Sequence, residues 1–137
     1  MKRFFRTGLL AAAVSLSGTL GASAMSCPEA ETAFFEQYQS QPFAKKRDAF
    51  MADPMRWDTA ASYYMSGASL LMMAEQAGQK VSAKSIDEFL ANTVIVDCWR
   101  PEDASDDPRL AAMVAHFDKQ FPSGRREMLK EKARSLK

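Results

Sequence analysis

The feature that most constrains this fold is an uncharged run of sixteen residues, 59–74, which lies between Asp58 and Glu75. The run contains three methionines, two tyrosines, two leucines and one glycine. It is too long for an ordinary strand, and too short and too rich in serine and alanine to cross a bilayer. We therefore predict a helix that is apolar on nearly every side and that other helices or a partner must cover.

Residues 1–24 have the pattern of an export signal. A positively charged start is followed by a mostly apolar stretch over 8–20 and by a small-residue cleavage site, Ala-Ser-Ala, at 22–24. We expect a mature chain that begins at Met25 and resides in the periplasm. An uncleaved membrane anchor is one alternative, which the short apolar stretch disfavours. A lipoprotein modified at Cys27 is another, and the residues before that cysteine depart from the usual pattern.

Residues 25–137 are enough for one domain with one hydrophobic core. Without the three basic residues of the signal, 15 basic and 17 acidic side chains remain, a net charge of −2. This balance, with no basic cluster in the body of the domain, disfavours a nucleic-acid partner. We expect no stable membrane span after cleavage of the signal.

The residues that catalysis requires are not found together in this sequence. It has one histidine, no glycine-rich phosphate loop, no metal-ligand spacing and no nucleophile with a neighbouring base. We therefore expect a protein that is not an enzyme and that holds no cofactor or metal.

Cys27 and Cys98 are the only two cysteines. In an oxidising compartment, a pair in a small exported domain most simply forms one disulfide. Closing so long a loop stabilises a fold by about 4 kcal/mol in the chain-entropy model. The alternative is a redox pair, or a metal site shared with His116, but there is no C-x-x-C spacing.

Two helical segments are expected before the central run. Ser26 can cap a first helix with Pro28 and Glu29 in its opening turn, and Pro42 should end or restart it. A second piece over 43–51 presents a basic triplet to solvent.

The central helix has its own start and stop signals. Asp58 or Thr59 is the expected N-cap, and Gly78 is suited to the C-terminal end. Gly67 in mid-helix is unfavourable by about 1 kcal/mol relative to alanine, so we expect another backbone to approach closely there.

Three further segments are expected after the central run. Ser85 and Glu88 have capping-box spacing for a helix that ends near Cys98. Its β-branched run at 93–96 has no second strand-like run to pair with, so we predict helix there. Asp107-Pro108 starts another helix. The charged residues 125–137 are expected to form a solvated terminal helix or a frayed tail.

The predicted fold is all-α, a small bundle of four to five helices stapled by one disulfide.

The sequence from 60 to 117 combines two local features with Cys27. They are Tyr63-Tyr64-Met65-Ser66-Gly67 in the central helix and Val96-Asp97-Cys98-Trp99-Arg100-Pro101 at the end of the next. Together with an export signal, this arrangement resembles the HdeA-type periplasmic acid-stress chaperones. The longer stretch between Cys27 and Trp57, and the extension after Pro122, depart from that pattern.

The resemblance implies a small disulfide-stapled homodimer that is inactive at neutral pH. In acid it would loosen and bind unfolding periplasmic proteins through apolar surface.

The charges of the mature chain are compatible with loosening in acid. Below about pH 3 most of the 17 carboxylates protonate and the mature side chains carry a net charge of about +16, which destabilises compact states. The alternative is that the central helix is simply the core of the bundle. The candidate client or dimer surface is Tyr63, Tyr64, Met65, Gly67, Leu70, Leu71, Met72 and Met73.

A function of a different class is the second hypothesis. A periplasmic immunity or inhibitor-type protein-binding module would present a compact acidic loop to the basic active site of its target. The candidate loop consists of Glu102, Asp103, Asp106 and Asp107.

Overall fold

The computed structural model describes residues 25–101 and 107–136. The expected export signal therefore lies outside the described residues, as do Glu102, Asp103 and Asp106 of the acidic loop. Within the described ranges every regular element is helical and none is a strand, which confirms the all-α prediction. The helices found in these ranges are all too short or too polar to cross a membrane.

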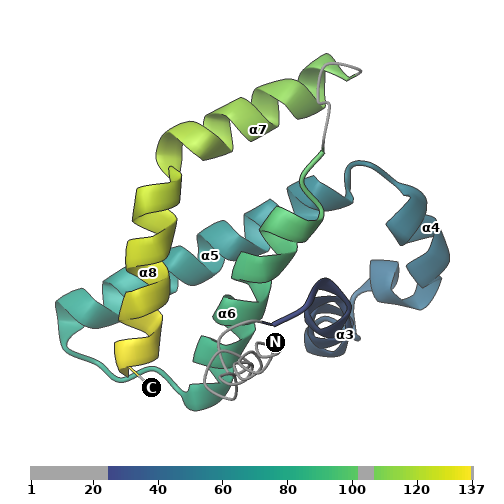
Figure 1. The fold of residues 1–137 in the computed structure, drawn as a ribbon. Coiled ribbons are helices and arrows are strands. Elements are labelled where there is room, and N and C mark those ends of the chain that lie inside the picture. The colour runs from purple at the N-terminus through teal and green to yellow at the C-terminus, as the bar shows by residue number, and fades with distance from the viewer. Residues whose placement is uncertain (1–24, 102–106, 137) are drawn as a thin grey trace, which may run out of the picture.

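The described chain contains six α-helices and one 3-10 helix (Figure 1). That is slightly more than the four to five expected, because the segment after Pro42 and the C-terminal segment each form separate helices. In chain order they are α3 (Cys27–Gln37), η1 (Pro42–Lys46), α4 (Arg47–Ala52), α5 (Arg56–Ala77), α6 (Ala83–Cys98), α7 (Pro108–Gln120) and α8 (Ser123–Leu136).

Helix α6 occupies the middle of the bundle. It packs against α3 on one side, against α5, and against α8, whereas α5 packs mainly against α6 and α7 (Figure 1). The expectation that the chain is organised around residues 59–74 is therefore incomplete. The central unit is the α5–α6 pair, and α6 makes most of the contacts that join the two ends of the chain.

Helix α5 begins earlier than its sequence signals indicate. It starts at Arg56, with Met55 as N-cap and no side-chain cap, instead of at Asp58 or Thr59. The turn before it is closed by Asp53, whose carboxylate accepts a hydrogen bond from the Met55 amide at 2.9 Å. The C-terminal prediction is confirmed, because Gly78 adopts a left-handed conformation with φ 66° and its amide closes the last turn.

The start of α6 also differs from the prediction. The N-cap is Ser82, whose hydroxyl accepts from the Ser85 amide at 3.1 Å, so Ser85 lies inside the first turn. Glu88 does not complete a capping box and instead pairs with Lys84 at 2.9 Å. The β-branched run is helical as expected, and the buried Thr93 hydroxyl donates to the Phe89 carbonyl.

Two aromatic clusters fill the core, one on each side of α5. The neighbouring tyrosines of α5 divide between them, because successive residues of a helix point in directions about 100° apart. The first cluster comprises Phe34, Phe35, Tyr38, Phe43, Phe50, Tyr63 and Trp99. The second comprises Trp57, Tyr64, Phe89, Phe117 and Phe121.

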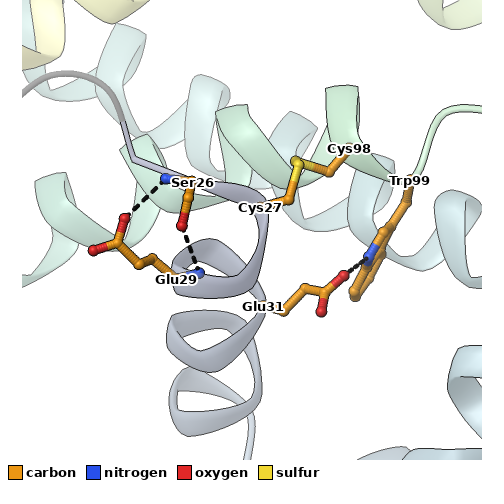
Figure 2. Close-up of a disulfide and its surroundings, with 6 residues drawn as sticks. All are labelled: Ser26, Cys27, Glu29, Glu31, Cys98 and Trp99. Carbon is orange, nitrogen blue, oxygen red and sulfur yellow. Dashed lines mark hydrogen bonds between the residues drawn. A yellow bond between two sulfur atoms is a disulfide. The ribbon is translucent and has the colours of Figure 1, made fainter. Parts of the chain in front are cut away.

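The predicted disulfide is present between Cys27 and Cys98, with Cα atoms 5.9 Å apart (Figure 2). It joins the first residue of α3 to the last residue of α6. Close by, the Trp99 indole donates to the Glu31 carboxylate at 3.0 Å. The capping box of Ser26 and Glu29 closes the start of α3, as Figure 2 shows. The staple and the cap together fix α3 against the end of α6.

Candidate functional site

The eight residues predicted as a client or dimer surface do not form one surface. Helix α5 turns two of them into the core, leaves four half-buried and exposes two. Tyr64 and Leu71 are buried, whereas Leu70 and Met73 are 65% and 63% exposed. The half-buried members are Tyr63, Met65, Gly67 and Met72.

The exposed side of α5 carries no charge between Asp58 and Glu75. Three exposed serines, Ser62, Ser66 and Ser69, precede Leu70 and Met73 along it. These two are among the few large apolar side chains that the described chain exposes. A limited apolar surface is therefore available in the folded state, and the rest of the predicted surface requires movement of the covering helices.

Gly67 faces a side chain and not another backbone, which corrects the expectation for this residue. A Cβ atom at Gly67 would lie 2.8 Å from Cδ1 of the Phe89 ring. The glycine thus allows α6 to place an aromatic ring directly against α5.

Helix α8 covers the α5–α6 pair through two buried side chains and two ion pairs. Leu129 and Ala133 are fully buried. Arg126 pairs with Asp97 of α6 at 2.7 Å, and Lys132 pairs with Glu75 of α5. The expected solvated helix or frayed tail is thus a packed helix on one face, and its opposite face remains exposed. Sequence reasoning missed Leu129, although its spacing of four from Ala133 is a core pattern.

The charges across this interface have opposite signs. Helix α8 has five basic and two acidic side chains, a net charge of +3. Helix α5 has a net charge of −1 and α6 a net charge of −2. The two acidic residues of α8, Glu127 and Glu131, pair with Lys130 and Arg134 of the same helix. The attraction between α8 and the helices beneath it therefore rests on carboxylates.

Tyr64 lies beneath this cover. Its ring contacts those of Phe89, Phe117 and Phe121 at centroid distances of 5.2 to 5.6 Å. Burial raises the pKa of Tyr64 to about 12, and nearby Arg126 opposes that shift. Its hydroxyl oxygen is buried without a hydrogen-bond partner among the described residues. The predicted surface residue is thus the centre of the second aromatic cluster.

Carboxylates also secure the ends of other helices. The Ser26 amide and hydroxyl hold the pKa of Glu29 below its usual value. Hydrogen bonds from the Arg109 and Leu110 amides, that of Arg109 foremost, lower the pKa of Asp107. Asp107 of the predicted acidic loop is therefore the N-cap of α7.

Another carboxylate pairs with an arginine. Asp118 of α7 accepts two hydrogen bonds from Arg100 and thereby raises the pKa of that guanidinium.

The described residues contain no group of three or more His, Cys, Asp or Glu side chains that could hold a metal ion. Cys27 and Cys98 are joined to each other, and His116 is exposed on α7.

Comparison of the chain with protein-family models, with curated proteins and with solved structures gave no match.

Proposed function

We propose that the chain is an exported, HdeA-like chaperone that acid activates and that binds unfolding periplasmic proteins. The observation that carries the proposal is the basic helix α8, seated on carboxylates of α5 and α6 over the second aromatic cluster. Protonation of those carboxylates removes the attraction that holds the cover.

The sizes of the interactions that hold α8 on α5 and α6 indicate why acid acts on this helix first. An exposed ion pair contributes about 0–1 kcal/mol, so loss of the Asp97 and Glu75 pairs alone is modest. Full protonation also reverses the sign of the charge beneath the helix. Helix α8 then carries +5 against +1 on each of α5 and α6, and like charges repel. Among the side chains of α8, only Leu129 and Ala133 are fully buried, so their burial alone opposes the repulsion.

Lifting α8 uncovers apolar side chains that the folded state hides. Met72 loses the Arg125 guanidinium, which lies 3.5 Å from its sulfur. Tyr64 loses the neighbouring charges of Arg125 and Arg126 and, if α7 follows, the rings of Phe117 and Phe121. These groups would extend the small surface formed by Leu70 and Met73. Methionine suits such a role because its flexible, polarisable side chain adapts to varied partners.

The disulfide limits how far the loosening proceeds. Since it joins α3 to the end of α6, these two helices stay connected in acid. Return to neutral pH restores the carboxylate charges and with them the attraction for α8.

The test measures, by light scattering, the aggregation of an unfolding client protein in the presence of residues 25–137, at neutral pH and at about pH 3. We expect suppression in acid only. The variant Glu75→Gln with Asp97→Asn should begin to suppress aggregation at higher pH, because it removes the pairs under α8. The matched variant Glu127→Gln with Glu131→Gln removes two carboxylates from α8 itself and should not. Absence of suppression in acid by the unmodified chain would overturn the proposal.

A further inference from the structure

A methionine sulfur and a guanidinium group are in contact where α8 meets α5. Nη2 of Arg125, in the first turn of α8, lies 3.5 Å from Sδ of Met72 on α5. Met72 is half-buried and the contact itself is exposed, so it lies at the surface of the molecule. A thioether sulfur is only a weak hydrogen-bond acceptor, and the contact in this form therefore does little to hold α8 on α5.

The guanidinium of Arg125 is fixed by the end of α7 and the turn after it. Its Nη1 donates to the Gln120 carbonyl at 2.9 Å, and its Cζ lies 5.0 Å from the centroid of the Phe121 ring, within the range of a cation–π contact. No carboxylate of the described residues forms an ion pair with it, because Glu75 and Asp97, which reach α8 from α5 and α6, pair with other residues of that helix. A charged donor is thus held beside the methionine sulfur without a strong acceptor there.

Oxidation of the sulfur supplies such an acceptor. A peroxide is the class of oxidant required: the sulfur lone pair attacks one peroxide oxygen, the S–O bond forms and the O–O bond breaks. The sulfur loses two electrons, and the departing hydroxide takes the proton of the transferred oxygen and leaves as water. The product, methionine sulfoxide, is polar and can be reduced back to the thioether by sulfoxide reductases.

We propose that Met72 is a site of reversible oxidation whose sulfoxide oxygen accepts a hydrogen bond from Arg125 and thereby fastens α8 to α5. With the sulfur 3.5 Å from Nη2, an oxygen bonded to one side of that sulfur comes within the ordinary N–H···O distance of about 2.7–3.2 Å. Neither helix therefore has to move. Hydrogen bonds from charged donors are about twice as strong as neutral ones, so the oxidised contact is much stronger than the thioether contact.

The fixed donor distinguishes Met72 from its more exposed neighbours. Met73 and Met128 are 63% and 53% exposed and should be oxidised at least as readily. Among the described residues, however, no hydrogen-bond donor lies against either sulfur, whereas one lies against that of Met72. Oxidation of these two methionines makes the surface more polar, and oxidation of Met72 adds a bond between two helices.

This bond does not depend on a carboxylate. A guanidinium remains charged in acid, and a sulfoxide oxygen does not protonate between neutral pH and about pH 3. The pairs that Glu75 and Asp97 make with α8 are lost over the same range. Oxidation of Met72 should therefore hold α8 in place in acid and lower the pH of its release; this consequence alone rests on the proposed function.

The experiment treats folded residues 25–137 with hydrogen peroxide at neutral pH. Peptide mass spectrometry locates the sulfoxides, and amide hydrogen exchange compares the start of α8 before and after oxidation. We expect a sulfoxide at Met72 and exchange about tenfold slower at the start of α8, the effect of one hydrogen bond to a charged group. Treatment with sulfoxide reductases should restore the original rate. A Met72 that stays unoxidised in the folded chain, or exchange that is unchanged or faster, would overturn the proposal.

Two leucine variants, oxidised in parallel, assign the effect to one sulfur. Met72→Leu removes the acceptor and should show no slowing, although its other methionines are oxidised as before. Met73→Leu removes the adjacent, more exposed sulfur and should slow like the unmodified chain. Slowing that persists in the first variant or disappears in the second would contradict the assignment. Because these measurements use neutral pH and no client, their failure would leave acid activation untouched, and failure of acid activation would leave the sulfoxide bond untouched.

Discussion

At the residue scale, Gly67 is the position where the Phe89 ring of α6 packs directly against α5. A glycine in the middle of a long helix indicates close approach, and close approach is found there. The identity of the neighbour depends on how α5 and α6 are aligned, which no local pattern specifies. The same holds for Tyr63 and Tyr64, whose division between two clusters follows from helix geometry only when the positions of α3 and α7 are known.

Adding a single methyl group at Gly67 tests this contact. Because the new Cβ would lie 2.8 Å from the Phe89 ring, Gly67→Ala should lower the free energy of unfolding by about 1–3 kcal/mol despite alanine's better helix propensity. Gly124→Ala is the matched control, since its Cβ would meet no atom within 4 Å beyond its chain neighbours and the backbone of its own helix, and α8 should gain up to about 1 kcal/mol. Urea unfolding measures both. Equal gains in the two variants would show that the ring does not pack against Gly67.

At the element scale, some helix ends follow their local sequence signals and others, the starts of α5 and α6 among them, do not. The starts of α3 at Ser26 and α7 at Asp107, and the end of α5 at Gly78, follow their local signals. The start of α5 does not, because the turn at Asp53 and Pro54 begins the helix without a side-chain cap. Helix α8 was underestimated because its buried side is narrow and its charges dominate the local composition.

Adjacent residues of α8 should respond very differently to truncation. Leu129 is fully buried, so Leu129→Ala should lower the free energy of unfolding by about 2–5 kcal/mol. Met128 is 53% exposed, so Met128→Ala should change it by no more than about 0.5 kcal/mol. Thermal unfolding of the two variants provides the comparison. Similar small losses would mean that α8 does not pack on α6.

The capping box of α3 should make stability depend on pH. The folded pKa of Glu29 is lowered, so its contribution is present above the unfolded pKa of about 4.3 and is lost as pH falls through the folded value. Glu29→Gln keeps an acceptor for the Ser26 amide but removes the charge. We expect the variant to be less stable at neutral pH and equal to the unmodified chain in strong acid, by urea unfolding. In a Ser26→Ala background the difference at neutral pH should shrink; a pH-independent difference would contradict this account.

At the scale of the whole molecule, the disulfide joins the two ends of the α3–α6 unit. Its closed loop spans 71 positions, and in the chain-entropy model such a crosslink stabilises the fold by about 4 kcal/mol. Cys27→Ser with Cys98→Ser should therefore unfold at a much lower urea concentration. A midpoint unchanged by the two substitutions would show that other contacts between α3 and α6 determine stability. The pairing was predictable from two cysteines in a small chain; the position of α6 between α3, α5 and α8 was not.

For the whole molecule, we propose that acid releases α8 while α3 and α6 remain joined. Amide hydrogen exchange of residues 25–137, corrected for intrinsic rates at neutral pH and at about pH 3, measures this directly. We predict that peptides from α8 lose protection in acid while those from α6 near the Cys27–Cys98 disulfide retain it. Retained protection of α8 in acid, or loss of α8 and α6 together in one global transition, would contradict the account.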